Sequence, residues 1–380
     1  MGFDEDDNRY FSSEMKCLVG ICSKIKEFPP GHFMTEKDKN PVKYYSKNWM
    51  DYSKLNNKYS LNGLRDSLEN SVKRQLMSDV PYGVLLSGGL DSSITSAIAK
   101  KYSEKRIESD DKQRAWWPQL HSFSVGLDGS PDLKAAQEVA KYIGTVHHEI
   151  KFTIQEGLDA IREVIYHLET YDTTTIRAAT PMYLMSRKIK ALGIKMVLSG
   201  EGADEIFAGY LYFHKCDNAL KFDKECRRLL ENISYFDVLR SDRCISSWGL
   251  EPRTPFLDKS FVTFYLNLPL EFRFEKNVIE KKVVRDAFTN SLSPFLPNDV
   301  LFRKKEAFSD GVSSRERSWY KIIQEKKYNI NNIKVENSYN RPRTEEQEYY
   351  RNIFNIHFPN LFKLIPYFDI ISIAIVYSFF

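Results

Sequence analysis

The sequence predicts an α/β fold, in which a doubly wound parallel sheet carries helices on both faces. Four short apolar runs alternate with helical patterns, at residues 82–86, 120–127, 145–150 and 194–199. Strands that are apolar throughout and separated by helices are typical of parallel sheets buried on both sides. Two of the runs end in glycine-rich turns, and ligands of such sheets bind beyond the carboxyl ends of the strands.

The opening of the chain is less regular. The first ten residues are acidic, and we expect them to be frayed. The pattern of residues 12–22 favours a helix, and residues 27–34, with two prolines and a glycine, favour a turn that leads into a strand. This opening section is too short to form a domain by itself.

Regular elements start at residue 61. Leucine and valine at helical spacing predict a helix over residues 61–72, and the first strand follows at 82–86. A second helix, with isoleucine and alanine on one face, is predicted over residues 92–102. Residues 100–114 are rich in charge, which favours a solvated helix end and loop over a binding patch. The second strand is predicted at 120–127.

The next helix has clear signals at both ends. Ser130 can cap it, Pro131 suits its first turn and Gly144 can end it. The third strand follows, and apolar spacing predicts another helix over residues 158–168.

A further helix is predicted to start at Thr180 and Pro181 and to end at Gly193. The fourth strand comes directly after it, at residues 194–199. From Cys216 onward the pattern is mainly helical and has no strand rhythm. We therefore expect the sheet to be complete before that point.

The bulk composition narrows the class of protein. The formal charge is +4, from 55 basic and 51 acidic residues. The sequence contains no long block of Lys and Arg, which argues against a dedicated nucleic-acid binder. Five cysteines without a signal-peptide pattern predict reduced thiols in a cytoplasmic protein. The apolar run at residues 370–380 is shorter than the roughly 20 residues that span a bilayer, so we expect a buried or aberrant tail and no membrane anchor.

The first glycine-rich turn reads Ser-Gly-Gly-Leu-Asp-Ser-Ser, at residues 87–93, and is called the phosphate loop below. Gly88 and Gly89 let a polyanion approach the main chain, and the N–H groups of the turn and of the next helix would point at it. Asp91 would repel a bare phosphate, so it suits this place only if a cation such as Mg²⁺ lies between them. The glycine spacing matches neither the Walker nor the dinucleotide pattern. The alternative is a turn that is merely capped by serine.

The second glycine-rich turn, residues 199–205, is called the acidic turn below. It holds Glu201, Asp204 and Glu205 at the end of a predicted strand. Like charges this close together need cations, hydrogen-bond donors or solvent. A simple solvated turn is the alternative explanation.

The phosphate loop, placed after a buried strand, resembles the pyrophosphate loop of the ATP pyrophosphatase superfamily. Together with the acidic turn and with residues 169–191, 251–258 and 303–313, it makes the chain similar to glutamine-hydrolysing asparagine synthetase, from about Tyr10 to Pro359. The related β-lactam synthetases share the loop but match the other segments less well. The resemblance implies a sheet of the adenine nucleotide α-hydrolase-like (HUP) type and a mainly helical C-terminal half.

The resemblance also implies an activity. Enzymes of this family make asparagine from aspartate through a β-aspartyl-AMP intermediate and release AMP and pyrophosphate, with ATP and Mg²⁺ as cofactors. The partners that it implies are the small molecules aspartate, ATP and ammonia, with no nucleic acid and no membrane. The oligomeric state stays open, and a homodimer is one option.

Site residues can be carried over position by position. The resemblance assigns ATP binding to Leu85, Ser87, Gly88, Gly89, Leu90, Asp91, Ser92, Ser93, Val125, Ser199 and Gly200. Leu85 and Val125 would touch adenine through their main chain. Asp91 and Asp204 match metal-linked positions.

The resemblance names two catalytic residues. Glu201 matches a carboxylate that contacts the aspartyl-adenylate and is proposed to take a proton from ammonia. Lys305 matches the lysine that neutralises charge on the phosphates. Asp237 and Arg253 match positions at the substrate site or its edge without a defined role, and a buried ion pair is an equally good expectation for Arg253.

The chain departs from the family at both ends. We expect residues 1–58 to be the remnant of a glutamine amidotransferase domain, 59–358 to be the synthetase domain and 359–380 to be a divergent apolar tail. Gly2 stands where the family has its nucleophilic cysteine, and neither Cys17 nor Cys22 matches that cysteine. The expected nitrogen source is therefore free ammonia.

A non-catalytic product is the alternative, either a fragment or a subunit that associates with intact synthetase. A cut glutaminase domain should expose apolar side chains, and Leu18, Ile21 and Phe33 are the ones we expect to be exposed.

Overall fold

A computed structural model of the protein describes residues 1–51, 59–103, 119–289, 294–305, 311–313, 318–326 and 339–366. The charged run beyond residue 103 and the apolar tail from residue 367 lie outside the described residues. None of the described helices combines the length and the apolarity that crossing a bilayer requires.

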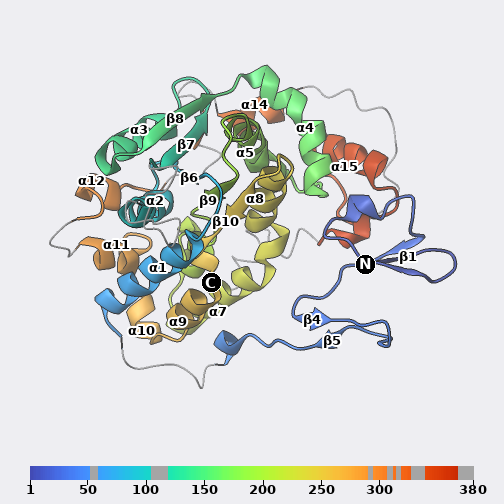
Figure 1. Ribbon diagram of the computed structural model, residues 1–380, viewed down its shortest axis with the longest axis horizontal. Helices are drawn as coiled ribbons and strands as arrows, with labels where there is room; N and C mark the ends of the chain where they lie inside the picture. Colours follow the sequence, from blue (N-terminus) through green and yellow to red (C-terminus); the bar gives the residue numbers. More distant parts are fainter. Residues whose placement is uncertain are drawn as a thin grey trace.

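A five-stranded parallel sheet forms the centre of the molecule (Figure 1). Its strands are β6 (Tyr82–Leu85), β7 (His121–Gly126), β8 (Val146–Lys151), β9 (Met196–Leu198) and β10 (Glu251–Arg253). They lie in the order β10-β9-β6-β7-β8, and every neighbouring pair is parallel. The predicted α/β class and the four predicted strands are confirmed.

The fifth strand corrects the expectation that no strand follows Cys216. β10 is three residues long and lies at the edge of the sheet, where it pairs with β9 from Glu251 opposite Met196. It contains Pro252, which an edge strand tolerates because one side of such a strand forms no hydrogen bonds with another strand. A strand this short is not long enough to show an alternation of apolar and polar residues in the sequence.

Helices cover both faces of the sheet. On one face lie α1 (Leu61–Gln75), α2 (Leu90–Ser103) and α3 (Pro131–Ile143), and on the other lie α4 (Ile154–Leu168), α5 (Thr173–Ala191) and α8 (Asp237–Ser246). Each face has its own apolar core, and neighbouring residues of one strand serve different cores because strand side chains alternate. Val84, for example, belongs to the first core and Leu85 to the second.

Helices dominate the C-terminal half, as predicted. The other helices among the described residues are α6 (Ala203–Ile206), α7 (Ala219–Asn232), α9 (Lys259–Leu266), α10 (Leu270–Arg273), α11 (Lys282–Thr289), α12 (Asn298–Leu301), α14 (Trp319–Glu325) and α15 (Glu345–His357). Single 3₁₀ turns connect several of them.

The helix signals in the sequence were mostly right. α3 begins and ends as expected, with the Ser130 hydroxyl accepting from the backbone of its first turn and Gly144 in the left-handed conformation at φ +73°. The predicted start of α5 at Thr180 and Pro181 is wrong, because Asp172 caps that helix and Pro181 lies inside it.

The proline is accommodated by a distant side chain. Pro181 has no N–H to donate to the carbonyl of Arg177, four residues earlier. The indole Nε1–H of Trp319 donates to that carbonyl instead, at 3.0 Å. Trp319 is fully buried, so this contact also fixes α14 against α5.

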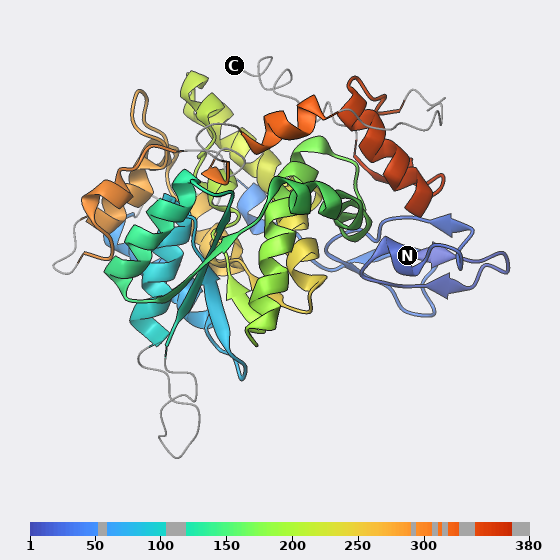
Figure 2. The same ribbon diagram turned by 90° about the horizontal axis from the view of Figure 1, so that it is seen from above.

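The N-terminal lobe, residues 1–51, lies at the side of the main body, close to α15 (Figures 1 and 2). It contains a small antiparallel sheet of β1 (Gly2–Phe3), β2 (Arg9–Tyr10) and β3 (Lys24–Ile25), and a pair formed by β4 (His32–Phe33) and β5 (Val42–Lys43). The expected fraying of the first residues is wrong, since Gly2 and Phe3 pair with two strands. The predicted strand after the proline turn is confirmed as β4.

The N-terminal lobe differs from prediction in two further respects. The predicted helix over residues 12–22 is only a 3₁₀ turn at Met15–Cys17. Leu18 is buried, contrary to expectation, whereas Ile21 and Phe33 are 55% and 46% exposed, as predicted. All five cysteines are free thiols.

One buried carboxylate fastens the lobe to the sheet domain. Glu169, at the end of α4, accepts hydrogen bonds from the backbone N–H groups of Met15 and Lys16 at 2.8 and 2.6 Å. Arg243 of α8 pairs with the same carboxylate at 3.4 Å. The lobe is therefore held in place by a specific polar contact as well as by packing.

Candidate active site

The strand order places a cavity where the chain reverses direction across the sheet. From β6 the connections lead outward to β7 and β8, and from β9 they lead the other way to β10. Open α/β sheets bind ligands at such a switch point, outside the carboxyl ends of the strands. The phosphate loop follows β6 and the acidic turn follows β9, and both line a cavity of about 390 Å³.

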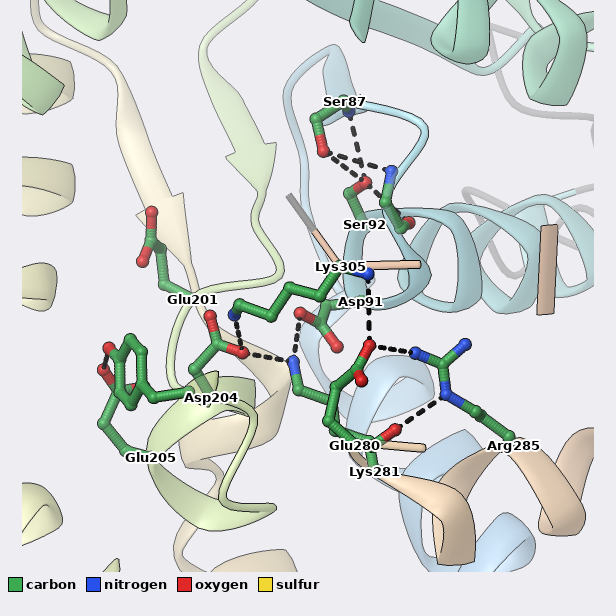
Figure 3. A network of polar contacts seen from close by, with 12 residues as sticks. Ser87, Asp91, Ser92, Glu201, Asp204, Glu205, Glu280, Lys281, Arg285 and Lys305 are labelled. Carbon is green, nitrogen blue, oxygen red and sulfur yellow. Dashed lines mark hydrogen bonds and ion pairs between the residues drawn. The ribbon is translucent and has the colours of Figure 1, made fainter. Parts of the chain in front are cut away.

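The phosphate loop is held by its own hydroxyl groups. The Ser87 N–H donates to the Ser92 hydroxyl at 3.2 Å, and the two hydroxyls lie 3.0 Å apart (Figure 3). The Ser92 hydroxyl also donates to the Gly89 carbonyl at 3.2 Å. These contacts set the loop in one shape before any ligand arrives.

Gly88 is the residue at which this shape requires glycine. Its φ is +75°, a left-handed conformation that disfavours other residues. A Cβ at this position would lie 2.5 Å from the main chain of Ala135 in α3, so there is also no room for a side chain. The loop is thus pressed against α3.

Most of the predicted nucleotide-binding residues meet at the cavity. Those that line it are Leu85, Ser87, Gly89, Leu90, Asp91, Ser92, Val125, Ser199 and Gly200. The structure does not bring Gly88 or Ser93 to the cavity wall. Gly88 faces α3, and Ser93 is fully buried in the first turn of α2.

The acidic turn packs directly against the start of α2. A Cβ at Gly200 would lie 2.9 Å from the Ser92 nitrogen, so only glycine allows the two turns to approach this closely. Gly202 has φ +89° and lets the chain enter the short helix α6, which carries Asp204 and Glu205.

Two lysines join the acidic turn to the phosphate loop. The Lys281 ammonium lies 2.5 Å from Asp91 and 2.5 Å from Asp204, and Lys305 pairs with Asp204 as well. Figure 3 shows both amino groups directed at the Asp204 carboxylate. Burial by itself raises the pKa of Asp204, but the two lysines lower it below its ordinary value. The sequence analysis found Lys305 and missed Lys281.

The carboxylates of Asp91 and Asp204 could hold a divalent cation. Their oxygens converge on one positive group, the Lys281 ammonium, so they can face a common ion. Across the described residues there is no cluster of three or more His, Cys, Asp and Glu side chains that would enclose a metal. Such a pair suits Mg²⁺, which is usually bound through one or two carboxylates and completed by phosphate and water oxygens.

Lys305 is positioned by a buried ion pair that the sequence analysis missed. Glu280 accepts from the Lys305 backbone N–H at 3.1 Å and from the Arg285 guanidinium at 2.9 Å. Arg285 is fully buried and also donates to the carbonyls of Leu301 and Arg303. Because all these groups converge on the segment before Lys305, they fix the direction from which its side chain enters the cavity.

Arg303 links this segment to the phosphate loop. Its guanidinium donates to the Gly88 carbonyl at 3.0 Å and to the Asp132 carboxylate of α3 at 3.3 Å. The phosphate loop, α3 and the lysine-bearing segment are therefore connected.

Carboxylates dominate the opposite wall of the cavity. Glu201 pairs with Arg240 at 3.1 Å, and the same guanidinium binds Asp237. The Tyr210 hydroxyl donates to Glu205 and lies 3.2 Å from Asp237. Glu201 and Asp237 thus share one arginine, which leaves negative charge in excess, whereas Glu205 has the Tyr210 hydroxyl as its donor and does not line the cavity.

The excess negative charge affects the ionisation of Glu201. Burial, together with nearby Asp237 and Asp204, raises its pKa to about 7, although Arg240 acts in the opposite direction. Burial and the same two aspartates also raise the pKa of Glu205 well above its ordinary value. A carboxyl that titrates near neutral pH is suited to proton transfer.

Helix α5 closes the cavity on a further side with Thr174 and Arg177. Arg177 forms a bidentate pair with Glu346 of α15, in which the Nε–Oε1 distance is 2.8 Å. Glu346 is only 3% exposed, so α15 is tied to the cavity wall.

Arg253 is the predicted site residue that the structure places elsewhere. Its guanidinium donates to the carbonyls of Gln75 and Met77 and to Glu251, at 2.6 to 2.7 Å. It does not line the cavity but ties β10 to the end of α1. The role is structural, but the expected buried ion pair is not formed, because the carboxylate partner Glu251 is exposed. Asp237, in contrast, does line the cavity.

Comparison with known proteins places these features in a family. A family model described as asparagine synthase matches residues 63–223 and 215–354. The chain is 53% identical over 367 residues to asparagine synthetase B [glutamine-hydrolyzing] of Escherichia coli (strain K12), a match that covers 94% of this chain and 65% of that protein. It is 45% identical over 374 residues to a probable asparagine synthetase [glutamine-hydrolyzing] of Dictyostelium discoideum, covering 94% and 67%.

A plant relative matches over a similar span. Asparagine synthetase [glutamine-hydrolyzing] 1 of Arabidopsis thaliana is 48% identical over 368 residues, covering 94% of this chain and 62% of that protein. The chain therefore spans about two thirds of the length of these relatives. A solved structure of NAD+ synthetase from Burkholderia pseudomallei aligns with 61% of this chain and 88% of its own at 13% identity, with a TM-score of 0.28, which is too low to bear on the fold.

Proposed function

The chain belongs to the asparagine synthase family, and from this premise we propose that it makes asparagine from aspartate, ATP and ammonia through a β-aspartyl-AMP intermediate. The observation that carries the proposal is the cavity itself. A glycine-rich anion loop and a carboxylate-rich turn face each other across the switch point of the sheet, with lysines between them. The arrangement suits a reaction in which a carboxylate attacks a phosphate.

The phosphate loop is the part that would bind the triphosphate. Its N–H groups and the N-terminus of α2 favour an anion, and Ser87 and Ser92 add hydroxyl donors. Adenine would lie along the main chain near Leu85 and Val125, at the ends of β6 and β7, since both residues line the same cavity.

Adenylation needs positive charge between the two reactants. The aspartate carboxylate and the α-phosphate repel each other, so cations preorganised at the phosphates lower the barrier. Lys305 and Lys281 would supply two such cations. Asp91 and Asp204 would hold Mg²⁺, which when bound neutralises charge on the departing pyrophosphate.

The acidic wall would recognise the amino acid. Asp237 lines the cavity in a region of excess negative charge, which favours the α-ammonium group of aspartate. Arg240 holds Glu201 and Asp237 in place from α8.

Glu201 would act as the base. Ammonia that attacks the activated carbonyl gains a positive charge, and a nearby carboxylate can remove the surplus proton. The pKa of about 7 means that Glu201 is largely able to accept a proton at slightly alkaline pH.

The experiment that tests the proposal follows pyrophosphate release and asparagine formation by the purified chain with ATP, Mg²⁺ and aspartate. Parallel reactions contain ammonium, glutamine or no nitrogen donor. We expect asparagine with ammonium and no stimulation by glutamine, because neither Cys17 nor Cys22 matches the nucleophilic cysteine of the family. Folded protein that makes no asparagine with either donor would contradict the proposal and favour a non-catalytic role. Folding is checked by the melting temperature, which ATP with Mg²⁺ should raise if the nucleotide binds the native state.

A further inference from the structure

The ammonium of Lys281 lies where the two proposed metal ligands meet. It is 2.5 Å from Asp91 and 2.5 Å from Asp204 (Figure 3). Its side chain is only 3% exposed. The two aspartates come from the phosphate loop region and from α6, so a single lysine joins the two halves of the site.

The position of this lysine is built into the backbone around it. Lys281 itself has φ +59°, an unfavourable conformation for a residue other than glycine. A Cβ at Gly209 would overlap the Lys281 side chain, so the glycine leaves the passage through which that side chain reaches the aspartates. Strained residues of this kind gather at functional sites, where surrounding structure maintains them.

A lysine ammonium and a divalent cation cannot use the same pair of carboxylates together. At a separation of a few ångströms two positive charges repel each other strongly, and the more so in a partly buried site. Lys281 must therefore leave at least one aspartate before a metal ion can bind between them. Lys305 contacts the same oxygen of Asp204 but does not pair with Asp91, so Lys281 is the lysine that lies between the two aspartates.

We propose that Lys281 is a placeholder cation, which occupies the metal position in the nucleotide-free enzyme and moves to the phosphates of ATP when the nucleotide and its metal arrive. The inference rests on the proposed function. It implies that the metal alone binds weakly, because it must displace a lysine that is held by two aspartates. With ATP present, the phosphates offer Lys281 a new partner, so metal and nucleotide bind together.

The test measures how tightly the protein binds Mn²⁺, which serves as a probe for Mg²⁺, in the absence of nucleotide. The concentration of free Mn²⁺ is followed by its electron paramagnetic resonance signal. The variants are Lys281→Met, Lys281→Arg and Lys282→Met. We expect Lys281→Met to bind Mn²⁺ at least about tenfold more tightly than the original chain, since a neutral side chain no longer competes, and one removed neighbouring charge is readily worth a factor of ten. Lys281→Arg should stay weak, because it keeps the charge. Lys282→Met removes an adjacent lysine that pairs with Asp286 outside the site, and its Mn²⁺ affinity should be unchanged.

A second measurement follows the nucleotide. In EDTA, Lys281→Met should bind ATP at least about tenfold more weakly than the original chain, because a charge-assisted contact to phosphate is lost. A lysine that only holds the fold would leave this affinity unchanged. Melting temperatures show whether each variant is folded, and Lys281→Gln replaces Lys281→Met if the methionine variant is not.

Two outcomes separate the inference from the proposed function. Folded Lys281→Met that binds Mn²⁺ no better than the original chain overturns the placeholder role, while turnover of the original chain with ammonium would leave the proposed function standing. The double variant Lys281→Met, Asp91→Asn tests the metal ligands. If it still binds Mn²⁺ tightly, the ion binds elsewhere, and both the placeholder role and the proposed metal ligands are overturned.

Discussion

The two turns that form the cavity are stabilised in different ways. The phosphate loop is held in part by its own neighbours, through hydroxyl contacts among Ser87, Gly89 and Ser92. The distant Arg303 adds one hydrogen bond, to the Gly88 carbonyl. The acidic turn owes its geometry to residues far along the chain, since Glu201 pairs with Arg240 and Asp204 pairs with Lys281 and Lys305. A local motif can be recognised from sequence, whereas a balance of buried charges depends on which distant elements meet.

The comparison predicts that changes on the acidic side will mainly affect chemistry. Glu201→Gln should lower the rate of asparagine formation by about 10²–10⁴-fold, because an amide cannot accept the proton of ammonia. ATP affinity, measured by calorimetry, should change little, since Glu201 belongs to the other turn. A rate within threefold of the original would exclude the role of Glu201 as the base.

Lys305 tests whether charge at the phosphates drives the first step. Lys305→Met should lower kcat by about 10²–10³-fold, the usual effect of removing one preorganised contact to a developing charge. Pyrophosphate release in single-turnover reactions is the measurement, and Lys282→Met, outside the cavity, is the matched control. Equal activity of the two variants would remove Lys305 from the site.

The pH dependence sharpens the contrast, because the pKa of Glu201 on the acidic side is raised to about 7. Glu201 must be deprotonated to act as a base, and its pKa is raised to about 7, so kcat should rise with pH through that value. Between pH 6 and 8, at a fixed concentration of free NH₃, the increase should be about tenfold. A flat profile would indicate that another group takes the proton.

The same raised pKa of Glu201 predicts that the stability of the fold depends on pH. The pKa of Glu201 in the folded state lies above the ordinary value of 4.5. Glu201 therefore contributes fully to the stability of the folded state below pH 4.5, and this contribution is lost as the pH rises through about 7. Glu201→Gln should therefore weaken the dependence of the unfolding free energy on pH between 5 and 7. Chemical denaturation at several pH values measures it, and an unchanged dependence would contradict the prediction.

A pair of glycines tests whether the close packing of the phosphate loop on α3 requires glycine. Gly88→Ala should lower the free energy of unfolding by about 1–3 kcal/mol, because it forces a left-handed alanine against α3. Gly89→Ala is the matched control, since its Cβ would meet only the Ser87 hydroxyl at 3.4 Å and its φ is ordinary. Urea denaturation without nucleotide measures both, and equal losses would show that the steric argument is wrong.

Arg253 should have the smallest effect on chemistry. Arg253→Met leaves the carbonyls of Gln75 and Met77 without their donor, so the free energy of unfolding should fall by about 1–3 kcal/mol. The activity of the folded variant should stay within about twofold, because the side chain does not reach the cavity. A large rise in KM for aspartate would restore the substrate role that the family resemblance suggested.

The sequence by itself determined the parallel sheet, most helix ends and the phosphate loop. These features depend on neighbours in the chain, such as the apolar strands, the Ser130 cap and the glycines after β6. It did not reveal β10, which is three residues long and contains Pro252, because a strand so short exists only through its pairing with β9. Apart from β4, the strands of the N-terminal lobe were likewise hidden, since each has two residues and depends on partners such as Tyr10 and Ile25.

Only the tertiary structure decided how the charges of the site are shared. Lys281, Arg240 and Glu280 stand in the sequence as ordinary charged residues, and nothing in their immediate neighbours marks them. Folding brings Lys281 to Asp91 across 190 positions and sets Glu280 behind Lys305. The physical reason is that the strength of a charge pair depends on distance and burial, and both are properties of the folded chain.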